Sequence, residues 1–207
     1  MTTSNRQRNR TLYLVQLSML VAVLLMLEFT GLGYIKTLGL EFTIMTVPVI
    51  VGAIVLGPLA GTILGAVFGL SSLLQAITGK SPFGAILYGI NPLGTVITTV
   101  PTRILMGLFC GLLFVGLTRW LKNKTLQYSL ASLAGALLNT LFFMTSFLLF
   151  FYRSQPVQEF AVSMGSKSAI GFAFAFVGLQ GFLEAVICAV LGTAISRALA
   201  TRGRRSA

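Results

Sequence analysis

Four polar side chains that could bind a ligand lie deep inside otherwise apolar stretches of the sequence: Arg103, Asn139, Gln180 and Glu184. A guanidinium group presents a planar fork of donors that matches a carboxylate, and amide groups supply orienting hydrogen bonds. Ionisable and amide groups at membrane depth usually face an interior cavity, because exposing them to lipid is costly. These residues predict a pocket, open to the outside, that binds a small molecule carrying a carboxylate.

The same residues also allow a structural interpretation, in which Arg103 and Glu184 form a buried ion pair and the two amides hold helices together. The pocket is favoured because Pro101 and the pair Asn91-Pro92 break the chain close to Arg103. Broken backbone at membrane depth is tolerated where it lines a cavity. Whether Glu184 touches the ligand or only holds Arg103 stays open at this point.

The composition argues against an enzyme. All 4 acidic residues are Glu, and the sequence has no Asp and no His. A Ser-His-Asp triad, an HExxH zinc site and a Walker B aspartate therefore lack their parts. We expect no catalytic residue, no metal site and no cofactor, and we interpret Cys110 and Cys188 as small apolar core residues.

The stretch Gly79-Lys80-Ser81 has the last three letters of a phosphate-binding P-loop, but Leu74 stands where that motif needs its first Gly. We interpret 79–92 as an outer loop in which Pro82 prevents a helix from starting as a P-loop helix does. Three of its side chains could instead form a lid over a ligand, with two aromatic surfaces and one amide: Phe83, Tyr88 and Asn91. The alternative is a structured turn packed on the rim.

The elements that must position these residues are membrane helices. The chain has 207 residues, of which 56% are hydrophobic and 9% charged, and its mean hydropathy is +0.91. Apolar runs long enough to cross a bilayer of about 30 Å predict six helices in a single all-α membrane domain, 1–207: they lie near 11–30, 43–57, 58–78, 93–119, 126–151 and 170–199.

The distribution of cations predicts the orientation. Ten of the 15 Lys and Arg residues fall in 1–10, in the connection after 119 or near the C-terminus, including the tail 200–207. The positive-inside rule then predicts that both termini are cytoplasmic in a bacterial cell membrane, and it explains the net charge of +11 without a nucleic-acid partner. The outer segments, about 31–42, 79–92 and 152–169, are longer, and 31–42 could form a small hairpin over the mouth.

Glycine spacing predicts how two of the helices pack. Gly57, Gly61, Gly65 and Gly69 recur every fourth residue, which lets two helix backbones approach closely. We expect this contact to lie inside the chain. The small pair Ser18 and Ala22 on 11–30 is a candidate docking face for a partner, with internal packing or lipid contact as the alternative.

The chain resembles the substrate-binding (S) components of energy-coupling factor (ECF) vitamin transporters, and within them the subgroup often assigned to pantothenate. The stretches that carry the resemblance are EFTIMTVPVIVGAIVLGPLAGTILGAVFGLSSLLQ, FG…INP…VPTRILMG, LLNTLFF and GLQGFLEAVICAVLGTAIS. The resemblance covers almost the whole chain. It implies an S-component-like bundle that captures a vitamin from outside and docks on a scaffold membrane subunit and two ATPases.

The resemblance also implies roles for single residues. In the family an Ala-xxx-Ala pattern on the first helix meets the scaffold, and here that place reads Ser18-x-x-x-Ala22. Pantothenate would offer a carboxylate to Arg103, polar groups to the amides of Asn139, Asn91 and Gln180, and a dimethyl centre to Phe83 or Tyr88. The alternatives are an S component for another B vitamin or precursor and a membrane assembly protein without a ligand. A self-sufficient transporter or channel is disfavoured, because no inverted repeat is evident.

Overall fold

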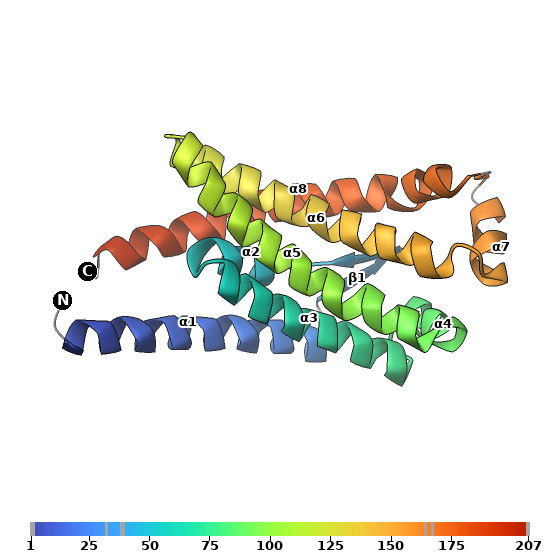
Figure 1. Cartoon of the computed structure of the whole chain (residues 1–207), viewed down its shortest axis with the longest axis horizontal. Coiled ribbons are helices and arrows are strands. Elements are labelled where there is room, and N and C mark those ends of the chain that lie inside the picture. The colour runs from blue at the N-terminus through green and yellow to red at the C-terminus, as the bar shows by residue number, and fades with distance from the viewer. Residues whose placement is uncertain (1–2, 32, 38–39, 164, 167, 206–207) are drawn as a thin grey trace.

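The computed structural model describes the backbone of residues 3–31, 33–37, 40–163, 165–166 and 168–205. Within these ranges, side chains are described except at 3–6, 9, 34–37, 40–42, 160, 169–170, 173–177, 179–180 and 200–205. Helices make up nearly all of it (Figure 1). In chain order the elements are α1 Thr3–Thr30, β1 Tyr34–Thr37, β2 Leu40–Thr43, α2 Thr46–Val55, α3 Pro58–Thr78, α4 Pro82–Ile90, α5 Pro92–Trp120, α6 Lys124–Phe151, α7 Gln155–Ser163 and α8 Ala169–Arg205.

Five helices in the described part of the chain are long and apolar enough to cross a membrane, namely α1, α3, α5, α6 and α8. The predicted second span corresponds to α2, which has 10 residues and is therefore only about 15 Å long. Residues Thr46 to Ile54 of α2 are all buried, and they pack against α3, α5, α6 and α8. The fold is an all-α membrane bundle, as predicted, while a sixth complete span stays a prediction.

Both chain ends lie at one end of the bundle, on the left of Figure 1. We call it the terminus end, and it also holds the turn between α5 and α6 at 121–123. The opposite end, which we call the loop end, holds α4 and α7 (Figure 1). The strands β1 and β2 pair in an antiparallel hairpin with Tyr34 opposite Thr43. The predicted hairpin is confirmed, and its position over a mouth stays a prediction.

The interpretation of 79–92 as a loop was wrong, because α4 starts within it at Pro82. Proline is favoured at the first helical position, where its missing N–H would have no partner and its fixed φ suits the helix. The Oγ of Ser81 accepts a hydrogen bond from the backbone N–H of Gly84 at 3.2 Å and caps the helix. Pro82 therefore starts a helix where we expected it to prevent one. The outer segment 152–169 likewise contains a helix, α7.

The predicted glycine contact lies inside the chain, between α3 and α5. A methyl group at Gly61 would overlap the backbone of Gly107, and one at Gly65 would overlap the carbonyl of Arg103. A methyl group at Gly69 would lie 2.8 Å from the Cα of Val100. Gly57 behaves differently: it precedes α3 with a φ of 100° and no neighbour within 4 Å. A glycine at position 57 allows the turn into Pro58, since other residues rarely adopt a positive φ.

Candidate functional site

Arg103 lies on α5 at the level where Gly65 brings α3 against its backbone. Its Nη1 donates hydrogen bonds to the backbone oxygen of Thr98 at 2.6 Å and to the Oγ1 of Thr102 at 3.0 Å. Pro101 lies between these partners in sequence and lacks an N–H, so the carbonyl of Ile97 loses its helical donor, although α5 continues through the proline. The guanidinium group thus binds the backbone of its own helix next to the proline.

Two aromatic rings from other helices hold the same guanidinium group. Its carbon lies 5.4 Å from the ring centroid of Phe68 on α3 and 4.9 Å from that of Phe143 on α6. Both distances are within the range of a cation–π interaction. Arg103 is only half-buried, and its rings and hydrogen bonds orient a cationic fork at the meeting point of α3, α5 and α6.

A row of buried threonines accompanies Arg103 on α5. They follow the i, i+3, i+4, i+7 spacing of one helix face: Thr95, Thr98, Thr99 and Thr102. Thr98 is fully buried, and its Oγ1 has no hydrogen-bond partner among the described residues. This face was not predicted, although the spacing of the threonines within TVITTVPT indicates it. A free hydroxyl beside Arg103 can bind a polar ligand group.

Glu184 on α8 is the acidic residue of a group that also contains Arg103 and Asn139, which we call the polar layer. Glu184 is only 6% exposed. Its Oε1 accepts hydrogen bonds from the Oγ1 of Thr46 on α2 at 2.8 Å and from the Nδ2 of Asn139 on α6 at 3.5 Å. The positive charge of Arg103 also acts on this carboxyl group. The predicted convergence of Arg103, Asn139 and Glu184 is therefore present in the fold. Thr46 was not predicted, because nothing in its local sequence indicates a contact with α8.

The side chains predicted to form a lid lie on and next to α4. Phe83 is half-buried, and its ring centroid lies 5.7 Å from that of Phe147 on α6. Phe147 in turn lies 6.0 Å from Phe143, the ring that contacts Arg103. A continuous aromatic row, Phe83–Phe147–Phe143, thus leads from α4 at the loop end to the guanidinium group. Tyr88 is half-buried on α4.

Asn91 has a structural role at the junction of α4 and α5. Its Oδ1 accepts a hydrogen bond from the backbone N–H of Gly94 at 2.9 Å, which caps the start of α5. The amide nitrogen is not used by this cap. Gln180 lies on α8, but its side chain is outside the described residues, so its assignment to the pocket stays a prediction.

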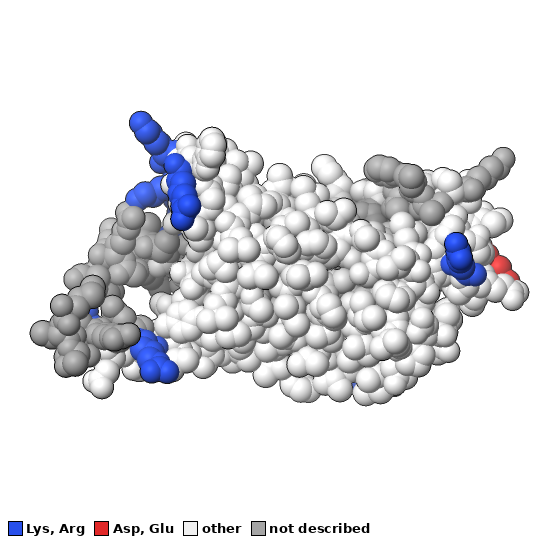
Figure 2. Space-filling view, in the orientation of Figure 1, with Lys and Arg blue, Asp and Glu red and all other residues white. Residues whose placement is uncertain are grey.

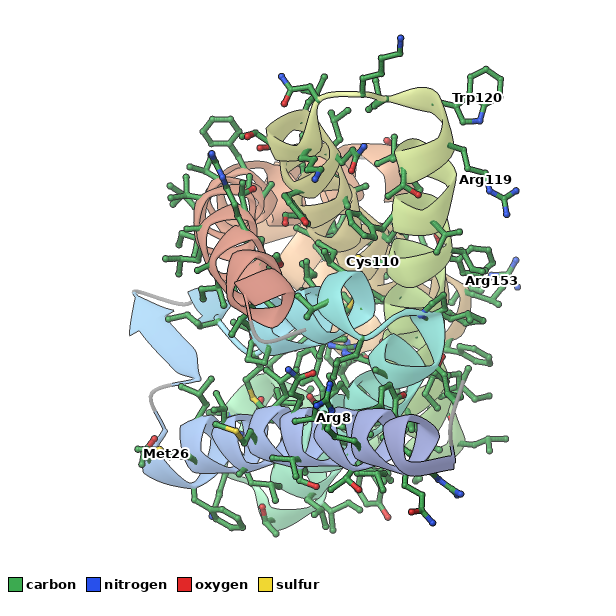
Figure 3. All side chains as sticks on the ribbon, turned by 90° about the vertical axis from the view of Figure 1, so that its left-hand side faces the viewer. Arg8, Met26, Cys110, Arg119, Trp120 and Arg153 are labelled. Atoms are coloured by element: carbon green, nitrogen blue, oxygen red, sulfur yellow. The ribbon has the colours of Figure 1, made fainter. Side chains whose placement is uncertain are left out.

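The rest of the described chain offers no metal centre: it contains no group of three or more His, Cys, Asp or Glu residues that could hold an ion. Cys110 and Cys188 are free and buried in the core, as expected. Figure 3 shows Cys110 among the surrounding helices. On α1, Ser18 and Ala22 are exposed and lie on a helix that contacts the bundle through α2 and α3.

Comparison with known families identifies the class of this protein. The family of ECF transporter substrate-specific components matches residues 12–196. The chain belongs to this family. Two curated relatives agree with it. The chain is 34% identical to the pantothenate transporter PanT of Leuconostoc mesenteroides subsp. mesenteroides over 142 residues, which cover 64% of this chain and 66% of that protein. It is 30% identical to the pantothenic acid transporter PanT of Lactococcus lactis subsp. cremoris over 173 residues, or 79% of this chain and 80% of that protein.

Membership of this family gives the chain a role in transport, as the substrate-specific component of a multi-pass membrane transporter. The polar layer combines one cation, one carboxyl group, one amide and several hydroxyls, supplied by α2, α5, α6 and α8. Such a mixed set of donors and acceptors suits a small molecule with several polar groups rather than an ion or an apolar compound.

Proposed function

We propose that this chain is the pantothenate-capturing subunit of an ECF importer, and that its ligand binds in the polar layer around Arg103. The main support for this proposal is the way in which Arg103 is oriented. Its guanidinium group lies between the rings of Phe68 and Phe143 and donates a hydrogen bond to the backbone oxygen of Thr98. A cationic fork fixed in this way can receive a carboxylate with little loss of side-chain entropy. The names of the two relatives support pantothenate as the carboxylate.

The other parts of pantothenate find matching groups nearby. Its amide and hydroxyls fit the unpartnered hydroxyl of Thr98, the amide oxygen of Asn139 and the amide nitrogen of Asn91. Asn139 Oδ1 and Thr98 Oγ1 are both buried without a partner among the described residues, and such groups usually bind water or a ligand. The apolar dimethyl centre fits the aromatic row at Phe83, with Tyr88 and Gln180 as further contacts. The role is one of binding and transport, without catalysis by this chain.

The charge distribution supports capture from the loop end, facing outside. In Figure 2 the Lys and Arg side chains gather at the terminus end, where Arg8, Arg10, Arg119, Lys122, Lys124 and Arg197 are all exposed. Figure 3, viewed from this end, shows Arg119 and Trp120 pointing outward. Arg153 and Glu159 are exposed at the opposite end. Cytoplasmic loops carry an excess of Lys and Arg, so we propose that both termini lie in the cytoplasm of a bacterial cell.

The partners follow from the family. We propose that the exposed face of α1 around Ser18 and Ala22 docks on the scaffold membrane subunit, which carries two ATPases. Two small residues one turn apart let a partner helix approach closely. The face around them is apolar, with Val15, Met19 and Met26 all exposed.

The test is thermal stabilisation of the detergent-purified protein by a panel of B vitamins and their precursors. A ligand at 100 times its dissociation constant adds about 2.7 kcal/mol to the free energy of unfolding. We expect a shift with pantothenate and with no other compound of the panel. A shift with another vitamin alone would replace the ligand but keep the class. No shift with any compound would favour an assembly protein whose buried polar groups serve only packing.

Two Arg variants connect the ligand to the site. Arg103→Lys keeps the positive charge but loses the planar fork, and we expect it to weaken pantothenate binding at least about tenfold, or about 1.4 kcal/mol. The matched control is Arg153→Lys, at an exposed position of the loop end, which should bind as the wild type does. Equal affinity of both variants would place the ligand elsewhere.

A further inference from the structure

The pair formed by Glu184 and Asn139 has a mismatch in its hydrogen bonding. The Nδ2 of Asn139 donates to Oε1 of Glu184, but the Oδ1 of the same amide is buried and has no partner among the described residues. An ionised carboxylate can only accept hydrogen bonds, so it cannot satisfy this oxygen. A buried acceptor left unpaired is unfavourable, because it has lost its hydrogen bonds to water. The ionised form of Glu184 therefore leaves this pair incomplete.

A protonated carboxyl group would complete it. It carries one O–H donor and still accepts at its other oxygen. The amide nitrogen of Asn139 can then donate to one oxygen of Glu184 while the second oxygen donates to Oδ1 of Asn139. The hydrogen bond from Thr46 to Oε1 is compatible with both forms, since Oε1 remains an acceptor. Asn139 can thus bind the acid form of Glu184 at both ends of its amide, while the second lone pair of its Oδ1 stays available to the ligand.

The charges of the polar layer determine when the protonated form of Glu184 is favoured. With Arg103 and an ionised Glu184, the layer is close to neutral. A carboxylate ligand on Arg103 adds a second negative charge to the same buried region, where like charges repel strongly. Uptake of one proton by Glu184 restores neutrality. The other titratable side chains on the elements around Glu184 are Arg103, Cys110 and Arg119 on α5, Cys188, Arg197, Arg202, Arg204 and Arg205 on α8, Lys124 and Tyr128 at the start of α6, and Glu41 on β2. The side chains of Glu41 and of the three arginines after residue 200 are outside the described part.

We propose that this protein binds its anionic ligand together with a proton, and that Glu184 is the proton site. The proton comes from the solvent and adds to the carboxylate of Glu184, which then donates to Oδ1 of Asn139. No other bond forms or breaks. This inference rests on the proposed capture of a carboxylate ligand, and it makes the proton a second ligand of the same pocket.

The experiment is calorimetric titration of the detergent-purified protein with pantothenate, in two buffers that differ in ionisation enthalpy, from about pH 6 to about pH 8.5. The vitamin's carboxyl group is ionised throughout, because its ordinary pKa is near 4. We expect uptake of about one proton per ligand toward the upper end of this range. Since binding and proton uptake are linked, the dissociation constant should rise by up to about tenfold per pH unit there.

Two variants assign the proton to its site. Glu184→Gln replaces the carboxyl group by an amide, which is neutral like a protonated carboxyl group and offers both a donor and an acceptor to Asn139. This variant should abolish the proton uptake and bind more tightly than the wild type at high pH. Glu159→Gln makes the same change on exposed α7 and should keep the uptake. The number of protons that the wild type takes up on binding is measured without any variant. It therefore tests the proposal even if Glu184→Gln fails to fold.

The outcomes separate this inference from the proposed function. Binding of pantothenate without proton uptake overturns the inference and leaves the function intact. Proton uptake that persists in Glu184→Gln also overturns it, because the proton then adds elsewhere. No binding of pantothenate at any pH overturns both.

Discussion

Gly61 of α3 and Gly107 of α5 meet backbone to backbone: a methyl group added to either would overlap the carbonyl group of the other. One turn further along α3, Gly65 faces the carbonyl of Arg103 in the same way. The contact therefore fixes α5 against α3 at the level of the polar layer. It also sets the position of Phe68 relative to the guanidinium group. The helix contact and the proposed ligand site therefore share the same stretch of the two helices.

Gly107→Ala should destabilise the protein by about 1–3 kcal/mol, because the two backbones must separate to admit the methyl group. The control is Gly116→Ala, on the same helix but with no neighbour within 4 Å. It should keep or raise the stability, since Ala favours a helix over Gly. The measurement is thermal unfolding in detergent. Equal effects of the two variants would argue against the close contact.

Thr46→Val should lower the stability of the protein by more than the small change in side-chain volume would suggest. The change keeps the shape of a fully buried side chain but removes the donor that lies 2.8 Å from Oε1 of Glu184. A buried carboxyl group that loses such a partner costs about 1–3 kcal/mol. Thr118→Val at the exposed end of α5 removes a hydroxyl bonded only within its own helix, and it should change stability by less than about 0.5 kcal/mol. Comparable losses in the two variants would show that the Thr46–Glu184 bond contributes little.

Features carried by local patterns were predictable. Hydropathy indicated the long helices, the four-residue glycine period indicated a close helix contact of α3 inside the chain, and the depth of Asn139 and Glu184 indicated a shared layer. In each case a single segment contains the signal. The proline at 82 was misjudged, because we took it as a barrier to a helix rather than as its first residue.

Contacts between distant segments were not predictable in this way. Thr46 reaches Glu184 across 138 positions of sequence, and Phe68 and Phe143 reach Arg103 from two other helices. A Phe in a membrane helix looks the same in sequence whether it faces lipid or a guanidinium group. Only the packing of α2, α3 and α6 around α5 selects these partners.

Asn91 allows its structural and binding roles to be separated. Its Oδ1 caps α5 through Gly94, and Asn91→Ala should cost about 1 kcal/mol of stability. Asn91→Ser keeps a capping oxygen but lacks the amide nitrogen proposed to contact the ligand. We expect it to match the wild type in thermal unfolding within about 0.5 kcal/mol and to bind pantothenate more weakly. Unchanged affinity in Asn91→Ser would restrict this residue to capping.

A polar contact joins α1 to α3 at the loop end. There the Nε2 of Gln75 on α3 donates to Oε1 of Glu28 on α1 at 2.6 Å, and both side chains are half-buried. Hydrogen bonds to charged groups contribute about 1.5–3 kcal/mol, more than those between neutral groups. A double-mutant cycle with Glu28→Ala and Gln75→Ala should therefore give a coupling energy of at least about 1 kcal/mol.

The chain supplies its own comparison for this cycle. Gln155 and Glu159 make the same type of hydrogen bond at 2.9 Å, but on the exposed surface of α7 and within one helix. Their coupling energy should stay below about 0.5 kcal/mol, because water competes for both groups. Thermal unfolding of the single and double variants gives both values. If the two couplings are equally small, the Glu28–Gln75 bond does not hold α1, and the apolar contacts of Leu17 and Leu24 must do so.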